Sequence, residues 1–137
     1  IKPVLLGNKL FIHVTGRTFN SHKDFMHQLK KSTPCLQEVK TVDECDFILV
    51  FCPVVSRAGT DIEAAEKSLY KISATKPAVL VVLHHTFDPG CVVSDSSRAA
   101  KRENMITYDC LFHEDQGLLK CTRNADVIKD IKTQIKT

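Results

Sequence analysis

The sequence lacks both a long hydrophobic run and a strong excess of one charge. No apolar stretch approaches the ~20 residues that a membrane-spanning helix needs, so we expect no membrane partner. The formal net charge is +3, from 19 basic and 16 acidic residues, and no basic stripe is interleaved with aromatic residues. We therefore expect no nucleic-acid partner.

The sequence also lacks the short motifs that name a reaction or a cofactor. The GxGxxG fingerprint, the P-loop and the nucleophile elbow are all absent, and we expect no cofactor. Six cysteines are present without any CxxC pair, and their even number leaves a disulfide framework open. The strong apolar strands indicate a core that needs no such staples, so we favour free thiols in a reducing, cytoplasmic setting.

What the sequence does contain is an alternation of short apolar runs with helix-patterned segments. With 137 residues, 43% of them hydrophobic, we expect one α/β domain spanning residues 1–137. The expected strands are 9–14, 36–39, 47–52, 78–83 and 105–112, and the expected helices are 21–31, 60–73, 95–103 and 124–136. The continuous β-branched runs are typical of strands buried on both faces of a parallel sheet. The prediction is a three-layer sandwich of flavodoxin or Rossmann type, with five mostly parallel strands in the order 2-1-3-4-5.

Several local features of this fold stay open or are predicted from single residues. Residues 41–45 are shorter than the dozen or so residues of a usual parallel crossover. They form either a single helical turn beside an edge strand or a link to a strand that pairs otherwise. Gly7-Asn8 can be a hairpin turn that adds an N-terminal strand. Ser21, Asp95 and Asn124 are placed to cap helices.

The expected strand order places a ligand crevice between the first and third strands. Such sheets bind ligands outside the carboxyl ends of the strands, where the strand order reverses. The loops at this crevice are residues 15–18, after the first strand, and residues 53–61, after the third. The second loop also leads into a helix, whose free N–H groups and dipole favour an anion. We predict an anion- or nucleotide-type crevice formed by Thr15, Gly16, Arg17, Ser56, Arg57, Gly59 and Thr60.

The same loops also have a plainer interpretation. Thr60 and Glu63 fit the S/T-x-x-E capping box, in which both side chains serve the helix end. Gly59 can simply supply a positive φ before that helix. Arg17 and Arg57 can be solvated loop charges, because arginine is mostly exposed.

A carboxylate at the start of the helix after the third strand can also act as a nucleophile on a glycosidic carbon. The pattern Cys45-Asp46, apolar strand, Gly59-Thr60 and Glu63 is similar to the nucleoside deoxyribosyltransferase-like group. The resemblance implies a nucleoside site. The alternative function is therefore a nucleoside or nucleotide N-glycosidase or transferase that uses Glu63 as its catalytic residue.

Histidines follow two neighbouring strands of the expected sheet. His84 and His85 close the fourth strand, and their side chains must point to opposite faces. His113 and Glu114 close the fifth strand, so one of the two histidines can meet His113 as a pair suited to a metal or to proton transfer. No ligand spacing of a known kind supports this hypothesis. We expect hydrogen-bonded loop histidines and no metal.

Four longer blocks carry a resemblance at the scale of the chain: DFILVFCPVVSRAGTDIEAA, KPAVLVVLHHTFDP, DSSRAAKREN and YDCLFHEDQGLLKC. They resemble a family of short, uncharacterised vertebrate proteins found in multiple copies. The resemblance implies a small intracellular protein and brings no catalytic residue. The first hypothesis for function is a binding module for an anionic small molecule or nucleotide. A surface for a protein partner or a homodimer is the other form of that hypothesis.

Overall fold

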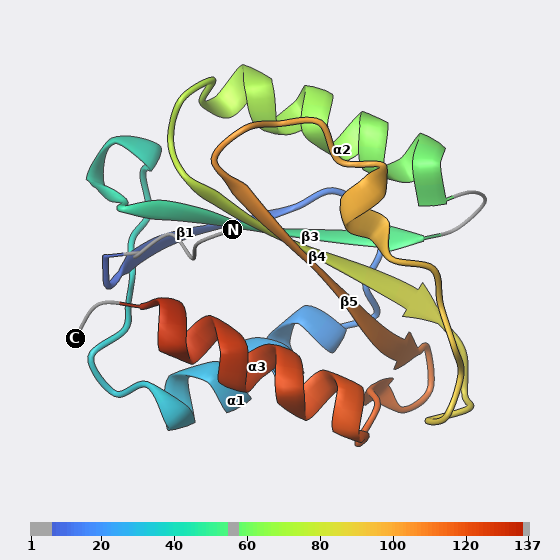
Figure 1. The fold of residues 1–137 in the computed structure, drawn as a ribbon. Coiled ribbons are helices and arrows are strands. Elements are labelled where there is room, and N and C mark those ends of the chain that lie inside the picture. The colour runs from blue at the N-terminus through green and yellow to red at the C-terminus, as the bar shows by residue number, and fades with distance from the viewer. Residues whose placement is uncertain (1–6, 55–57, 136–137) are drawn as a thin grey trace.

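The computed structural model describes residues 7–54 and 58–135, which form three layers with a sheet between helices (Figure 1). The sheet has the order β2-β1-β3-β4-β5-β6. Its strands are β1 (Lys9–Val14), β2 (Gln37–Glu38), β3 (Phe47–Val54), β4 (Ala78–His85), β5 (Met105–His113) and β6 (Gly117–Leu118). The first five pair in parallel, and β6 pairs with β5 in the antiparallel direction. The predicted α/β class and the order 2-1-3-4-5 are confirmed, and β6 is an addition.

The helices lie on both faces of the sheet, with α1 (Ser21–Ser32) and α3 (Thr122–Gln134) below it and α2 (Ala58–Ile72) above it in Figure 1. Two short 3-10 helices complete the described elements, η1 (Val42–Glu44) and η2 (Ser96–Arg98). The open question about residues 41–45 is answered by η1, a single turn beside the edge strand β2. The helix expected over 95–103 shortens to η2. The N-terminal strand suggested before Gly7 falls outside the described residues.

The central strands are buried on both faces, which explains why their sequences show no polar alternation. In β3, Phe47, Leu49 and Phe51 point to the layer of α1 and α3. The intervening Ile48 and Val50 point to the layer of α2. Two apolar cores therefore share one sheet, and each strand contributes alternate residues to each core.

The predicted helix caps have three different outcomes. Asp95 is a cap as predicted, because its side chain accepts a hydrogen bond from the Ser97 N–H at 3.0 Å. Ser21 is the first residue of α1 rather than its N-cap, which is Asn20. Asn124 lies inside α3, and its buried amide bonds to Leu111 N–H, Leu111 C=O and Leu119 C=O, each at 2.8 Å. The capping prediction for Asn124 is wrong because satisfying buried strand groups decides its place.

The hairpin between β5 and β6 holds the end of the sheet in place. Gly117 has a φ of 73°, a left-handed conformation that favours glycine. The Asp24 carboxylate of α1 accepts a hydrogen bond from the Leu118 N–H at 3.1 Å. This contact ties the hairpin, and Glu114 within it, to the helical layer.

All six cysteines lie in the described residues, and each is a free thiol. Burial raises the pKa of the Cys52 thiol to about 11. Among the helices that the structure describes, none combines the length and apolarity that crossing a bilayer requires.

Candidate functional site

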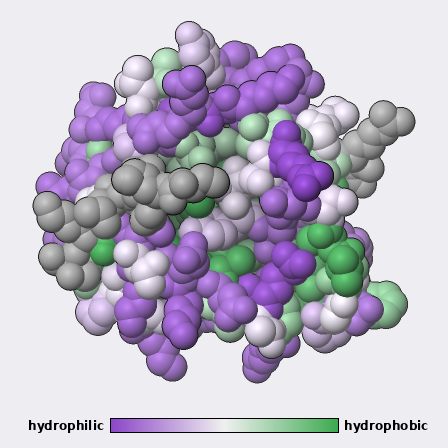
Figure 2. All heavy atoms as spheres, viewed as in Figure 1, coloured by the Kyte–Doolittle hydropathy of each residue, from purple (hydrophilic) through white to green (hydrophobic). Residues whose placement is uncertain are grey.

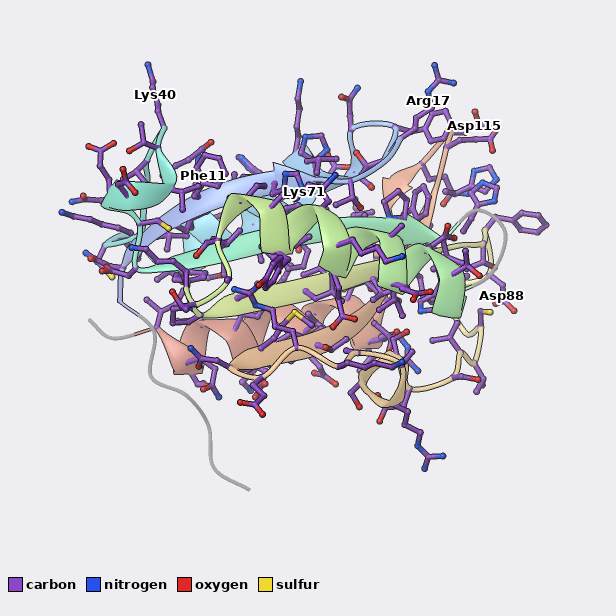
Figure 3. The ribbon with its side chains drawn as sticks, turned by 90° about the horizontal axis from the view of Figure 1, so that it is seen from above. Phe11, Arg17, Lys40, Lys71, Asp88 and Asp115 are labelled. Carbon is purple, nitrogen blue, oxygen red and sulfur yellow. The ribbon has the colours of Figure 1, made fainter. Side chains whose placement is uncertain are left out.

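A cavity of about 330 Å³ opens at the carboxyl ends of β1, β3, β4 and β5. Figure 3 shows Arg17 and Asp115 at this end of the sheet, with Lys40 at the opposite end. Figure 2 shows apolar surface gathered over the ends of β4 and β5. The cavity is lined by Arg17, Phe19, Val54, His85, Phe112 and Glu114. It therefore combines apolar walls with one cation, one carboxylate and one imidazole.

The loop after β1 supplies the cation, and two of its predicted site residues hold the loop in place. The Thr15 N–H and hydroxyl both donate to the Phe51 carbonyl of β3, each at 3.0 Å. A Cβ added to Gly16 would lie 2.9 Å from Cγ of Pro53, so the loop passes too close to β3 for a larger residue. Beyond these anchors, the exposed Arg17 lies over the Phe19 ring, 5.3 Å from Cζ to the ring centroid.

The loop after β3 departs from its predicted arrangement. Ser56 and Arg57 lie outside the described residues. Because α2 begins at Ala58, Gly59 and Thr60 are exposed residues of its first turn. Thr60 is therefore not the N-cap, and Gly59 has no positive φ, so both of these structural predictions are wrong. Ala58 packs against the core on the α2 side, and alanine has the highest helix propensity. Both favour a helix that begins two residues before the expected start at Thr60.

Glu63 is exposed on α2 and lines a separate groove of about 400 Å³. The other residues of that groove are Glu66, Lys67, Tyr70 and Lys71, all on the same helix. Arg17 lines the cavity at the strand ends instead. Glu63 and Arg17 thus face different hollows, while Arg57, the second predicted anion-binding arginine, lies outside the described residues.

Two histidines and a glutamate meet at the edge of the cavity. The rings of His85 and His113 stack with their centroids 5.1 Å apart and their planes 12° apart. His85 Nε2 lies 2.8 Å from Oε1 of Glu114. One ligand atom from each of the three side chains lies within 4.8 Å of the others. The sequence left open whether His84 or His85 meets His113, and in the structure it is His85, with Glu114 beside them.

His84 points to the opposite face of the sheet and has a different partner. Its Nε2 lies 2.7 Å from Oδ1 of the buried Asp109, whose Oδ2 accepts a hydrogen bond from the Ser96 N–H at 3.0 Å. Burial alone would raise the pKa of Asp109. The hydrogen bonds from His84 and Ser96 together outweigh burial and hold this pKa below its ordinary value. This group joins β4, β5 and η2.

Sequence reasoning missed the apolar lining of the cavity. Phe112 ends a strand that was expected only as core, Val54 follows the expected strand 47–52, and Phe19 follows Arg17 by two positions. Phe19 carried no distinguishing signal, since single apolar residues are common on protein surfaces. No family model, curated protein or solved structure matches the chain, so the site is interpreted from its geometry.

Proposed function

We propose that this protein is a small binding module that holds an anionic small molecule with a flat ring, such as a nucleotide, at the carboxyl edge of its sheet. The observation that carries the proposal is the cavity of about 330 Å³ with Arg17 at its wall. Parallel sheets of this kind bind ligands at that edge. The volume lies at the lower end of small-molecule pockets, which favours one nucleotide or a smaller ligand.

The side chains around the cavity divide into two kinds of contact. The guanidinium of Arg17 offers paired N–H donors to a phosphate or carboxylate. Phe19, Val54 and Phe112 offer apolar surface to a base or another ring. Glu114 is available to accept hydrogen bonds from a ring amine or a ribose hydroxyl. Arg57 remains a predicted second cation for this ligand.

Two further parts of the sequence hypothesis remain proposals. A cytoplasmic location is supported by the six free thiols, which fit a reducing compartment. A protein partner or a homodimer is the alternative occupant of the cavity edge. Phe87 and Val92, which are 72% and 89% exposed, are the apolar residues that support it.

The N-glycosidase alternative requires Glu63 and an anion-binding arginine to face one crevice. Arg17 does not line the groove of Glu63. Glu63→Gln is accordingly expected to leave nucleotide binding unchanged. Weaker binding in this variant would place the nucleotide in the groove of Glu63 instead of the cavity of Arg17.

The direct test is calorimetric titration of nucleoside monophosphates and of the matching nucleosides. Loss of a charged hydrogen bond of this kind costs about 1.5–3 kcal/mol, so Arg17→Ala is expected to weaken monophosphate binding by roughly 10- to 100-fold. Lys40→Ala removes a positive charge at the opposite end of the sheet (Figure 3) and is the matched control. Equal affinity in wild type and Arg17→Ala would contradict the assignment of the anion to this cavity.

A further inference from the structure

We propose that His85, His113 and Glu114 form a binding site for a divalent transition-metal ion, a role distinct from the anion contact of Arg17. Two neighbouring parallel strands bring the three residues together. His85 ends β4, His113 ends β5, and Glu114 follows it in the hairpin. The site needs no part of the loop 55–57.

The distances fit a site that closes around a metal with small side-chain rotations. Metal–nitrogen and metal–oxygen bonds of about 2.0–2.2 Å place two tetrahedral ligand atoms roughly 3.3 Å apart. His85 Nε2 and Glu114 Oε1 are already 2.8 Å apart, and all three ligand atoms lie within 4.8 Å of one another. A bound metal would therefore replace the hydrogen bond between His85 and Glu114.

Aromatic packing and strand pairing hold the imidazoles near that position. His85 pairs with Phe112 in the register of β4 and β5, and their rings lie 5.4 Å apart between centroids. Phe87 meets His113 edge to face, with centroids 5.7 Å apart. Ligands placed at the ends of paired strands lose less conformational entropy on binding than ligands on a free loop.

Asp115 is placed to act behind His113. The Asp115 N–H donates to His113 Nδ1 at 3.2 Å, so the neutral ring carries its proton on Nε2. Metal binding at Nε2 releases that proton to solvent and needs the tautomer protonated on Nδ1, so the hydrogen bond from the Asp115 N–H is given up on binding. The Asp115 carboxylate, whose Oδ2 lies 4.0 Å from Nδ1, reaches the new Nδ1–H after a side-chain rotation and then accepts from it. Carboxylates behind ligating histidines commonly fix the ring in this way.

The ligand set indicates which metal binds and where its free position faces. Two imidazoles and one carboxylate suit zinc, cobalt or nickel, whereas magnesium and calcium prefer all-oxygen sites. Three protein ligands leave one position open in a tetrahedral site. His85 and Glu114 also line the cavity of Arg17, so the open position faces the space proposed for the anion.

The test is titration of the full chain with Zn²⁺ followed by calorimetry, and with Co²⁺ followed by visible absorption. We expect saturable binding of one ion with cobalt bands of a tetrahedral nitrogen and oxygen site. This binding should be lost in His85→Gln, in His113→Gln and in Glu114→Gln. The expected effect of Asp115→Asn is a weakening of about tenfold.

Matched controls separate this site from other metal-binding groups. His84→Gln alters the adjacent histidine, which faces the other side of the sheet, and should keep full metal binding. A thiolate-to-cobalt charge-transfer band would assign the metal to a cysteine. Such a band, unchanged binding in both the His85 and His113 variants, or no saturable binding by wild type would each overturn the proposal. Circular dichroism of the His85, His113 and Glu114 variants establishes that each is folded.

The metal and anion proposals fail separately. His113 does not line the Arg17 cavity, so His113→Gln should lose the metal and keep metal-free nucleotide binding. Arg17→Ala should lose the nucleotide and keep the metal. If the protein binds nucleotide but binds neither Zn²⁺ nor Co²⁺, the metal proposal is refuted and the nucleotide proposal is not.

Discussion

Two adjacent histidines of β4 form the same kind of pair in opposite surroundings. His84 and Asp109 lie 2.7 Å apart with side chains only 13% and 7% exposed. His85 and Glu114 lie 2.8 Å apart with side chains 43% and 48% exposed. Chemistry and distance are nearly equal, so burial is what distinguishes the two pairs.

Burial assigns the two pairs different roles. In the buried pair, Asp109 Oδ1 meets His84 Nε2 and Asp109 Oδ2 accepts from the Ser96 N–H, so both carboxylate oxygens already have partners within the protein. The His85–Glu114 pair lies beside a second imidazole and a cavity, where water or a metal can replace one partner. A buried pair is costly to break, whereas an exposed pair is cheap to rearrange.

The largest effect on this comparison is expected from Asp109→Ala. The variant leaves His84 and the Ser96 N–H without their partner in a buried place. We expect a loss of about 3 kcal/mol in the free energy of unfolding, because breaking a buried pair strands the remaining polar groups. Urea denaturation measures it. A loss under about 1 kcal/mol, as for an exposed pair, would show that burial does not make the His84 pair more important for stability than the His85 pair.

The second-largest effect is expected from lowering the pH, which should reduce the stability that the buried His84–Asp109 pair contributes. The pKa of Asp109 is lowered in the folded state, so its contribution to stability is present above the ordinary aspartate pKa of about 3.9. It is lost as the pH falls through the folded-state pKa. Between about pH 5 and pH 3, wild type should lose more unfolding free energy than Asp109→Asn. Parallel pH profiles of the two proteins would contradict this linkage.

The smallest effect on stability is expected from Glu114→Ala. Its pair with His85 is about half exposed, and such pairs contribute under about 1 kcal/mol. We expect a change of less than about 0.5 kcal/mol in urea denaturation. A larger loss would mean that the hairpin depends on this pair for its structure, and the contrast with Asp109 would disappear.

The sequence predicted the sheet well because burial on both faces leaves a strong pattern. The continuous β-branched runs of β3 and β4 favour central parallel strands, and the order 2-1-3-4-5 came from the flavodoxin-like arrangement that such strands commonly adopt. The two-residue strand β6 was missed, since Gly117-Leu118 is too short to show any period. It forms because the turn after β5 returns onto that strand and Asp24 supplies a partner for the Leu118 N–H.

Single-residue predictions were less reliable than patterns. Thr60 fits a capping box in sequence, yet α2 begins upstream of it at Ala58. Asn124 resembles a cap, yet its amide serves the buried backbone of β5 and the following loop. In both cases packing outside the local segment outweighs a local preference of about 1 kcal/mol.

The candidate site divides in the same way. That Arg17 lies near the carboxyl end of β3 follows from the neighbouring positions of β1 and β3, which the strand order predicted. The meeting of His85 with His113 was one of two pairings that the sequence left open. The apolar walls of the cavity were not predicted, because Phe112 resembles an ordinary core residue and Val54 follows the expected strand 47–52 without a polar group to mark it.

By itself, the sequence determined the alternation of strands and helices and the edge of the sheet where polar side chains collect, because side-chain periodicity depends only on backbone geometry. Tertiary structure alone decided which histidine is buried and which is open. The reason is that η2 and Ser96 cover one face of the strand ends, while the other face opens onto the cavity beside Arg17. No local pattern encodes what packs over a side chain from a distant segment.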